Sequence, residues 1–299
     1  MFAFSPLKRL FAAFVLASAS AAAGQAPTQD YEPRPAMWLL QDADTKIYLF
    51  GTIHILPKGF RWISPAVERT IGEADELVVE TSTLDSANAH SATATMFLDR
   101  PVPILSRVPA ESRKALKAAI RRSGMPRRHL DRLQSWAAAM AIGVGTMLEA
   151  YGATDPGEMP GVEDVLEERF REARKPILSV EKPLDVVLSL NAMPAEEQSE
   201  LLVFGLDELG GEKEDMDEDD RAWATGKAEA LALDEEKDFP AALYEVLLVR
   251  RNVAWAEWLE RRLERPGTAL FAVGAGHLAG RDSVQKMLEK RGLKVSRAD

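Results

Sequence analysis

The sequence predicts an α/β fold, in which a central mixed β-sheet contains two β-(GxxH)-α-β units and is flanked by helices and a large helical insertion. Two observations lead to this prediction. Apolar runs of strand length at 46–51 and 268–273 each end in a Gly-x-x-His motif, and each motif is followed by a helical pattern and a further strand. The stretch between the two units, about 106–264, has mainly helical periodicity.

The first unit starts with a predicted hairpin. Strand-like runs at 37–41 and 46–51 are separated by Asp-Ala-Asp-Thr, a composition that favours a tight turn. Ser64 and Pro65 then indicate the start of a helix, because serine is a preferred N-cap and proline is favoured in the first turn. The next apolar run, 75–80, completes the unit as a strand.

This β-α-β arrangement predicts where two polar side chains lie. Crossover connections of this kind are nearly always right-handed and join parallel strands, so both strands end at the same edge of the sheet. His54 follows the first strand and Glu80 ends the second, and open α/β sheets bind ligands at that edge. The second unit repeats the pattern, because His277 is followed by a helix at about 281–291 and a strand at 292–296.

The insertion contains further expected elements. Helical patterns cover 109–123, the stretch from 127 or 129 to 142, and 162–173. A short strand at 175–181 ends in Glu181, which repeats the strand that ends in Glu80.

A long helix is predicted at 243–263. Its apolar face holds Leu248, Val249, Trp255, Ala256, Leu259 and Leu263. Asn252 lies in the middle of that face at spacings of three and four. A polar amide in such a place needs hydrogen-bond partners. We expect Asn252 to orient a substrate carbonyl or a ligand histidine, or to bond to the backbone.

Composition and charge limit the classes of partner. The chain of 299 residues is 46% hydrophobic, which is enough for one large core or two modest ones, and its formal net charge is -10. That charge argues against nucleic acid or an anionic membrane surface as the main partner, and favours a peptide or small-molecule substrate. Cysteine is absent, so no disulfide and no thiolate ligand or nucleophile is available. The acidic run at 207–221 lacks the glycine and the terminal glutamate of a calcium loop, and is expected to be a solvated loop that leads into a helix.

The N-terminus has the pattern of a secretory signal. Two basic residues precede an apolar stretch at 10–17, shorter than the ~20 residues that span a membrane, and small residues with Ala-x-Ala spacing follow. We therefore expect a cleaved Sec-type signal peptide at 1–23, a flexible arm at 24–35 and a single domain at 36–299. The mature chain is expected to have no membrane span, and it has no cysteine for a lipid anchor. The predicted location is periplasmic or secreted, and an uncleaved anchor is the alternative.

The residues at the predicted sheet edge have the chemistry of a metal site. Divalent ions such as Zn²⁺, Mn²⁺ and Co²⁺ accept imidazole nitrogen and carboxylate oxygen, and a His/His/Glu set leaves positions open for water and substrate. We predict that His54, Glu80 and His277 form this set, with Glu80 as ligand or general base. The alternative interpretation is that each Gly-x-x-His is a strand-exit turn whose histidine caps a helix. Two copies in matching contexts favour the metal site.

The remaining polar candidates have simpler alternatives. Glu181 is a candidate general base or further ligand, unless it is a solvated carboxylate at the start of a loop. His90 and His129 lie in polar and basic surroundings and are expected at the surface.

At these residues the chain resembles the TraB/GumN family (TraB/PrgY/GumN), which is related to the Tiki metalloproteases and more distantly to the erythromycin esterase-like and ChaN-like proteins. The resemblance covers about 36–297 and includes the sequences YLFGTIH, LVVE, GVEDVL and VGAGHLAG, and the pair Arg251 and Asn252. It implies a divalent metal, Mn or Co as in Tiki-type enzymes, and peptide hydrolysis as in the animal members. The family more often has Gly-Val-Asp where this chain has Gly-Val-Glu, so no role is assigned to Glu163.

These observations predict an exported metal-dependent hydrolase, in the first place a metallopeptidase. The metal would lower the pKa of bound water and polarise the scissile carbonyl. Glu80 or Glu181 would take the proton of the water, and Arg251 or Asn252 would stabilise the developing oxyanion. Two alternatives remain open: a non-catalytic periplasmic protein that binds a peptide, a signal molecule or haem, and a metal-dependent esterase that acts on a small molecule.

Overall fold

The computed structural model describes residues 29–82, 86–204, 213–233 and 240–299. The predicted signal peptide at 1–23 and the first part of the predicted arm lie outside the described residues. Among the helices that the structure describes, none is long and apolar enough to cross a membrane.

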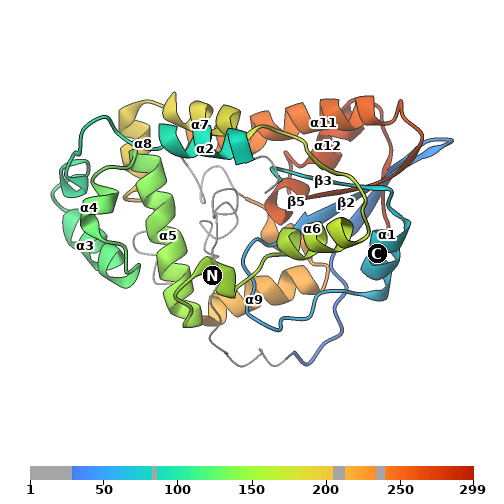
Figure 1. Cartoon of the computed structure of the whole chain (residues 1–299), viewed down its shortest axis with the longest axis horizontal. Helices are drawn as coiled ribbons and strands as arrows, with labels where there is room; N and C mark the ends of the chain where they lie inside the picture. Colours follow the sequence, from blue (N-terminus) through green and yellow to red (C-terminus); the bar gives the residue numbers. More distant parts are fainter. Residues whose placement is uncertain (1–28, 83–85, 205–212, 234–239) are drawn as a thin grey trace.

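A six-stranded mixed sheet forms one end of the protein (Figure 1). Its strands follow the order β4-β3-β5-β2-β1-β6. They are β1 (Met37–Gln41), β2 (Thr45–Thr52), β3 (Glu76–Val79), β4 (Ile177–Ser179), β5 (Gly267–Gly274) and β6 (Val295–Arg297). Within this sheet β1 runs opposite to the other five strands, so the predicted mixed sheet is confirmed. The strands that carry the two Gly-x-x-His motifs, β2 and β5, are direct parallel neighbours, with Thr52 opposite Gly274.

The first unit has the predicted local structure. β1 and β2 form a hairpin whose turn is held by Asp42, because its carboxylate accepts hydrogen bonds from the backbone of Asp44 at 3.1 Å and Thr45 at 2.9 Å. Helix α1 (Pro65–Glu73) begins at its N-cap Ser64, whose hydroxyl accepts from the backbone N–H of Val67 at 3.2 Å. β5 lies between β2 and β3, so a strand from the far end of the chain separates the two strands of this unit.

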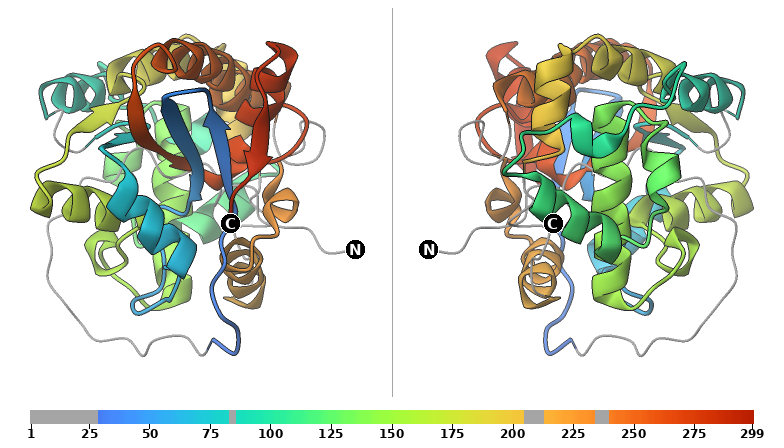
Figure 2. Two further views of the ribbon diagram at one scale, coloured as in Figure 1. Left: turned by 90° about the vertical axis from the view of Figure 1, so that its right-hand side faces the viewer. Right: turned by 90° about the vertical axis from the view of Figure 1, so that its left-hand side faces the viewer.

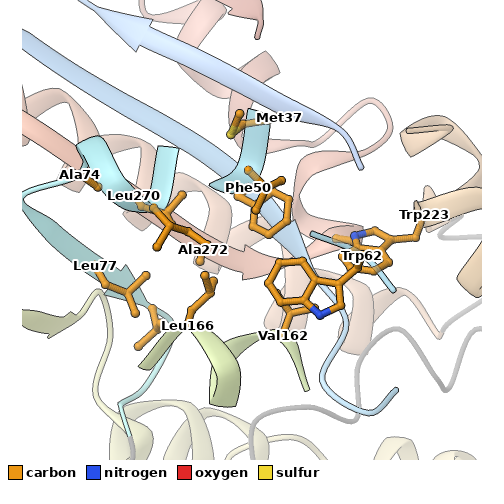
Figure 3. Packing of buried hydrophobic residues seen from close by; sticks show 14 of the residues in the cluster. Met37, Phe50, Trp62, Ala74, Leu77, Val162, Leu166, Trp223, Leu270 and Ala272 are labelled. Atoms are coloured by element: carbon orange, nitrogen blue, oxygen red, sulfur yellow. The ribbon is translucent and has the colours of Figure 1, made fainter. Parts of the chain in front are cut away.

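Helices cover both faces of the sheet, as the left view of Figure 2 shows. On one face pack α11 (Arg250–Arg262) and α12 (Val284–Lys290), and on the other α1, α6 (Val162–Glu172) and α9 (Lys213–Ala224). Alternate residues of β5 point to the two faces, as the two-residue period of a strand requires: Phe271 lies in the core under α11, and Leu270 in the opposite core. Figure 3 shows the opposite core, where the rings of Phe50, Trp62 and Trp223 pack together.

The predicted insertion forms a helical lobe beside the sheet, on the left in Figure 1. Its helices are α2 (Ser86–Thr95), α3 (Arg113–Arg122), α4 (Arg127–Leu130), α5 (Ser135–Tyr151), α7 (Pro183–Asn191) and α8 (Ala195–Leu201). Short 3-10 turns are η3 (Ile104–Ser106), η4 (Pro156–Glu158), η5 (Ala228–Leu231) and η7 (Ala275–Leu278). The helix predicted at 162–173 is confirmed as α6, whereas the helix predicted at 109–123 begins only at Arg113.

The prediction of one helix from 127 or 129 to 142 is wrong. The segment between α4 and α5 pairs with the segment after α2: Leu98 N–H donates to Arg132 O at 2.7 Å, and Gln134 N–H to Met96 O at 2.8 Å. The carboxylate of Asp131 also accepts from Ile104 N–H at 2.7 Å. These long-range bonds replace the intrahelical ones, so two helices form.

The helix predicted at 243–263 changes form along its length. α10 (Ala241–Tyr244) leads into a π-helical turn, η6 (Glu245–Val249), and then into α11. A π turn inserts one extra residue per hydrogen-bonded turn and so rotates the side chains before it relative to those after it. Leu248 therefore packs in the core of the helical lobe, whereas Trp255 and Leu259 pack on the sheet, and the single apolar face of the prediction is divided between two cores.

The acidic run and the arm also differ from a simple solvated chain. Part of the run at 207–221 lies outside the described residues, and the part from Lys213 onwards belongs to α9, where Asp219 and Asp220 are buried. In the arm, Arg34 N–H donates to Ala224 O at 2.6 Å, so the described residues of the arm run along α9.

Candidate functional site

The predicted metal ligands lie together at the carboxyl edge of the sheet. His54 follows β2, Glu80 follows β3, and His277 lies in η7 directly after β5. Glu80 Oε1 is 4.0 Å from Nε2 of His54 and 4.0 Å from Nε2 of His277. All three side chains are largely withdrawn from solvent, with exposed fractions of 17%, 7% and 5% for His54, Glu80 and His277. Three strand ends thus bring three potential donors to one place.

Gly274 occupies the centre of this arrangement. A Cβ atom at this position would lie 3.1 Å from Glu80 Oε1, 3.3 Å from His54 Nε2 and 3.6 Å from His277 Cδ2. Because glycine has no Cβ, the three groups face the same small space. The backbone N–H of Gly274 donates to Glu80 Oε1 at 2.7 Å and so fixes the carboxylate from β5.

Asn252 fixes the orientation and the tautomer of His277. Its Nδ2 donates to the backbone O of Asp282 at 2.8 Å, which directs its Oδ1 to His277 Nδ1 at 2.6 Å. Nδ1 therefore carries the proton, and Nε2 accepts a hydrogen bond from Arg251 Nη1 at 3.1 Å. Burial and the charge of Arg251 lower the pKa of His277 to about 3, so the ring is neutral at pH 7. These contacts agree with two of the interpretations offered for Asn252, because its Oδ1 orients a histidine and its Nδ2 bonds to the backbone.

Glu163 holds His54 in a comparable way. Its Oε1 lies 2.7 Å from His54 Nδ1 and also accepts from the hydroxyl of Thr52. Nδ1 of His54 thus faces a carboxylate, and Nε2 faces Glu80. Burial lowers the pKa of His54, but the charge and hydrogen bond of Glu163 together with the charge of Glu80 outweigh burial and leave that pKa raised. The second oxygen of Glu163, Oε2, is buried without a hydrogen-bond partner among the described residues.

A close approach of two backbones delivers Glu163 to this position. α6 has Gly161 as its N-cap, and Val162 N–H donates to Ile53 O at 2.9 Å. A Cβ atom on Gly161 would lie 2.3 Å from the backbone O of His54, which is too close for any other residue. Glycine therefore lets the first turn of α6 touch the Gly-x-x-His turn.

Arg251 supplies the positive charge of the site. Its Nη2 donates to Glu80 Oε2 and, at 2.5 Å, to Glu181 Oε1, and its Nε donates to Glu181 Oε2 at 3.0 Å. Burial raises the pKa of Glu80, but the charge of Arg251, the two histidines and the hydrogen bond from Gly274 together outweigh burial and lower the pKa to about 2. At Glu181 burial is the larger effect, so the pKa of this carboxyl is raised despite Arg251.

Glu181 holds Arg251 with a carboxylate that is largely withdrawn from solvent. Its side chain is 12% exposed, and its Oε2 also accepts from Trp255 Nε1 at 3.2 Å. The ring of Trp255 lies 4.4 Å from the ring of His277 and 4.7 Å from Arg251 Cζ, measured from the ring centroids. The alternative interpretation of Glu181 as a solvated carboxylate is therefore wrong.

The donor chemistry fits a divalent cation. Histidines that bind metals commonly present one ring nitrogen to the ion and hold the other against a carboxylate or a carbonyl. Glu163 and Asn252 hold Nδ1 of the two histidines in this manner, and the low pKa of Glu80 keeps its carboxylate ionised.

The donors are not closed into a coordination cage in this conformation. The spacings of 4.0 Å from Glu80 Oε1 to the two Nε2 atoms are near the largest that two bonds of about 2.1 Å can span. Arg251 also donates to His277 Nε2 and to Glu80. Accordingly, no three His, Asp or Glu side chains in the described parts of the chain are arranged to hold one ion. A cation at His277 would have to replace Arg251.

The two other histidines lie outside the site, and two residues that were not predicted belong to it. His90 and His129 are exposed, as predicted. Sequence reasoning missed Glu163 and Trp255 as parts of the site. Glu163 looked like one of two acidic residues in the first turn of a helix, and Trp255 like an ordinary core residue. The one local signal for Glu163 was the glycine that precedes its helix.

Comparison with protein families gives one clear match. The model of the TraB/PrgY/gumN family matches residues 36–297, which is nearly the whole chain and includes every residue of the site. Comparison with curated proteins gave no match, and comparison with solved structures gave none.

Proposed function

Since the chain belongs to the TraB/PrgY/gumN family, we propose that this site is a divalent-metal centre and that the protein is a metal-dependent hydrolase of peptides. The observation that supports the proposal is the arrangement of the two imidazoles. Each is held at Nδ1 by an acceptor, Glu163 or Asn252, and each has its Nε2 4.0 Å from the same carboxylate oxygen. His54, Glu80 and His277 would hold the cation, which would be Mn²⁺, Co²⁺ or Zn²⁺.

A bound cation would supply an activated water molecule and would polarise a carbonyl group. The protein side chains have distinct tasks around it. The pKa of about 2 at Glu80 favours a ligand over a proton acceptor. The raised pKa of Glu181 favours the role of proton acceptor. Glu181 can accept a proton only when Arg251 releases one of its oxygens.

Arg251 links cation binding to substrate binding in this proposal. His277 Nε2 has one lone pair, and Arg251 Nη1 occupies it at 3.1 Å. If His277 Nε2 held a cation, Arg251 Nη1 would be free to donate to the carbonyl oxygen of a substrate and would stabilise the oxyanion that develops there. Asn252, bonded to His277 and to Asp282 O, stays with its histidine.

We also propose that the protein acts outside the cytoplasm after cleavage of the segment 1–23. The basic, apolar and small-residue regions of the N-terminus support this proposal. N-terminal sequencing of the protein recovered from the periplasm or medium tests it, and an uncut Met1 would contradict it.

The test of function combines metal content with cleavage. Protein purified without chelators should contain close to one divalent ion per chain by elemental mass spectrometry. A peptide library incubated with the protein and Mn²⁺ should show new termini that disappear with chelator. The variants His54→Ala and His277→Ala should lose both properties, whereas the matched exposed-site variants His90→Ala and His129→Ala should keep them. If the double variant His54→Ala, His277→Ala bound metal as the wild type does, the proposed metal site would be wrong.

A second candidate function follows from the closed contacts of Arg251. With Glu80, Glu181 and His277 bonded to one guanidinium, the same edge could retain a ligand without cleaving it. The peptide library separates the two functions, because recovery of an intact bound peptide supports a binding protein. Turnover of small esters without peptide cleavage would instead support an esterase.

A further inference from the structure

The net charge of -10 conceals a strongly basic region in the helical lobe. Residues 100–132 contain ten Lys and Arg against two acids, Glu111 and Asp131, which is a formal charge of +8. The region comprises η3, α3, α4 and their connections, and α3 and α4 lie at the end of the protein away from the sheet (Figure 1). The right view of Figure 2 looks onto this end. The charge of the chain is therefore divided between a basic tip and an acidic remainder.

One side of α3 is a continuous basic stripe. At 3.6 residues per turn, its four members fall within about 100° of the helix circumference. They are Arg113, Lys114, Lys117 and Arg121, and all four are exposed. The buried residues of α3, such as Leu116 and Ile120, lie on a different side of the helix. Because the apolar side of α3 packs into the lobe, the basic stripe faces solvent.

The basic side chains continue onto α4 and remain largely unneutralised. Arg127 and Arg128 of α4 are exposed, and so is Arg132, two residues after its end. Arg127 lies 3.9 Å from Asp131. Among the side chains that the structure describes, no carboxylate lies within ion-pair distance of the four stripe residues or of Arg128 and Arg132.

Two exposed apolar side chains lie beside α4. Phe97 is 45% exposed and Val102 is 41% exposed. Phe97 pairs with Leu133 in an isolated antiparallel bridge, and Val102 N–H donates to Asp131 O at 2.8 Å. Arg107 fastens the same segment, because its Nη2 donates to Val102 O at 2.6 Å and to Asp131 O at 2.9 Å. Phe97 and Val102 are therefore held next to the basic helices.

We propose that this basic tip, formed by the α3 stripe, the exposed arginines of α4, Phe97 and Val102, binds the surface of an anionic lipid bilayer. Lys and Arg side chains near such a surface each strengthen binding by about fivefold through attraction to the lipid headgroups. Exposed apolar side chains add to this by entering the boundary between headgroups and acyl chains. The acidic remainder of the protein is repelled by the same surface, which orients the tip towards it. The net charge alone had argued against this partner.

The composition of the tip favours lipid over nucleic acid. Single-stranded nucleic acids are bound by several aromatic side chains on which bases stack. Phe97 is the only Phe, Tyr or Trp in the stretch 97–132. The aliphatic Val102 suits an acyl boundary and offers no stacking surface.

Vesicle sedimentation with the full chain tests the proposal. The protein should bind vesicles of mixed phosphatidylcholine and phosphatidylglycerol at low salt, should bind pure phosphatidylcholine weakly, and should be released as salt increases. Changing Arg113, Lys114, Lys117 and Arg121 to Gln should lower the partition coefficient by roughly 600-fold, which is about fivefold for each residue. Changing Phe97 and Val102 to Ser should lower it by about tenfold without altering the salt dependence. All variants share one N-terminus, so differences between them report on the tip.

A matched control removes four exposed basic residues from another region. It carries Gln at Arg261, Lys286, Lys290 and Lys294, which are exposed on α11, α12 and the chain after α12. This control should bind as the wild type does. Equal loss in the control, binding that is independent of anionic lipid, or no binding at low salt would overturn the proposal. Displacement from vesicles by an oligonucleotide that binds more tightly would assign the tip to nucleic acid instead.

Discussion

Glu163 and Asn252 perform parallel tasks for the two histidines. Each places an oxygen within 2.7 Å of an imidazole Nδ1, so that Nε2 faces Glu80. Asn252 comes from α11 and Glu163 from α6, which lie on opposite faces of the sheet. The two imidazole rings are therefore held by side chains from the helices on both faces of the sheet. Burial lowers the pKa of both rings, but at His54 the carboxylate of Glu163 acts against burial and helps to raise the pKa, whereas at His277 the charge of Arg251 lowers the pKa further.

At this scale the variant Glu163→Gln should weaken metal binding. The amide keeps the size of the side chain but removes the charge that strengthens His54 as a donor, and changes of this kind reduce metal affinity by about 10- to 100-fold. Titration of Zn²⁺ against a competing fluorescent chelator measures the effect. The control Glu168→Gln changes an exposed residue of the same helix and should bind normally. Equal affinity in Glu163→Gln and wild type would remove Glu163 from the site.

The variant Gly274→Ala should affect the site more than the fold. The added methyl group would lie 3.1 Å from Glu80 Oε1 and 3.3 Å from His54 Nε2, so it would occupy the space that the donors share. We expect loss of most metal affinity and a cost to folding below about 1.5 kcal/mol, since the neighbours need to shift only slightly.

Gly72→Ala is the matched control for this substitution. Its new methyl group would meet nothing within 4 Å, and Gly72 lies within α1, so alanine there should stabilise the protein by roughly 0.5–1 kcal/mol. Urea unfolding and metal titration of both variants give the comparison. Full metal affinity in Gly274→Ala would show that the donors do not meet beside Gly274.

At the scale of elements, the π turn η6 joins the two cores. Leu247 and Leu248 pack in the helical lobe, whereas Trp255 packs on the sheet. Arg251 and Asn252 lie in the first turn of α11, just after the π turn, and both contact His277. Irregular turns of this type often occur at functional sites because they change which side chains face a given direction. Because of this turn, one continuous helical segment packs in the lobe before the turn, packs on the sheet after it, and contributes Arg251 and Asn252 to the site.

Insertion of one alanine after Glu245 should therefore be damaging, although Glu245 is partly exposed. The π turn already contains one extra residue, so a second one would rotate α10 by about 100° relative to α11. We expect loss of several kcal/mol in the free energy of unfolding, because the apolar residues on one side of the turn would leave their core. Thermal denaturation measures this loss. The substitution Glu245→Ala, which keeps the residue count, is the control and should change stability by less than about 0.5 kcal/mol.

At the scale of the whole molecule, the site connects distant parts of the chain. His54 and His277 are brought together because β2 and β5 are parallel neighbours, and Glu80 joins them because β5 lies beside β3. Arg251 and Glu181 bind these strand ends to the helix that extends from the lobe. A ligand bound at this site would contact both the strand ends and the helices that cover the sheet.

Metal binding should accordingly stabilise the whole fold. A cation that binds only the folded state at a free concentration 100 times its dissociation constant adds about 2.7 kcal/mol. For a domain of this size that corresponds to an increase of roughly 5–10 °C in the melting temperature. Differential scanning fluorimetry with Mn²⁺, Co²⁺, Zn²⁺ or chelator measures the shift. The double variant His54→Ala, His277→Ala should show no shift, and an equal shift in that variant would place the stabilising ion elsewhere.

Much of the sheet could be predicted because its signals are local. The apolar runs of strand length located β2, β3 and β5, and Ser64 with Pro65 located the start of α1. The handedness rule for crossovers then placed His54 and Glu80 at one edge. The break between α4 and α5 could not be predicted in this way, because hydrogen bonds to Met96 and Ile104 create it.

The sequence by itself determined which residues are available and at which strand ends they stand: two Gly-x-x-His turns, the carboxylates Glu80 and Glu181, and no cysteine. These properties depend on composition and on periods of two and 3.6 residues, which a single chain displays. Only the tertiary structure decided that Glu163 faces His54, that Arg251 joins Glu80 to Glu181, and that the basic residues of α3 form one stripe beside α4. Such contacts depend on how separate elements pack, and packing is set by the whole molecule.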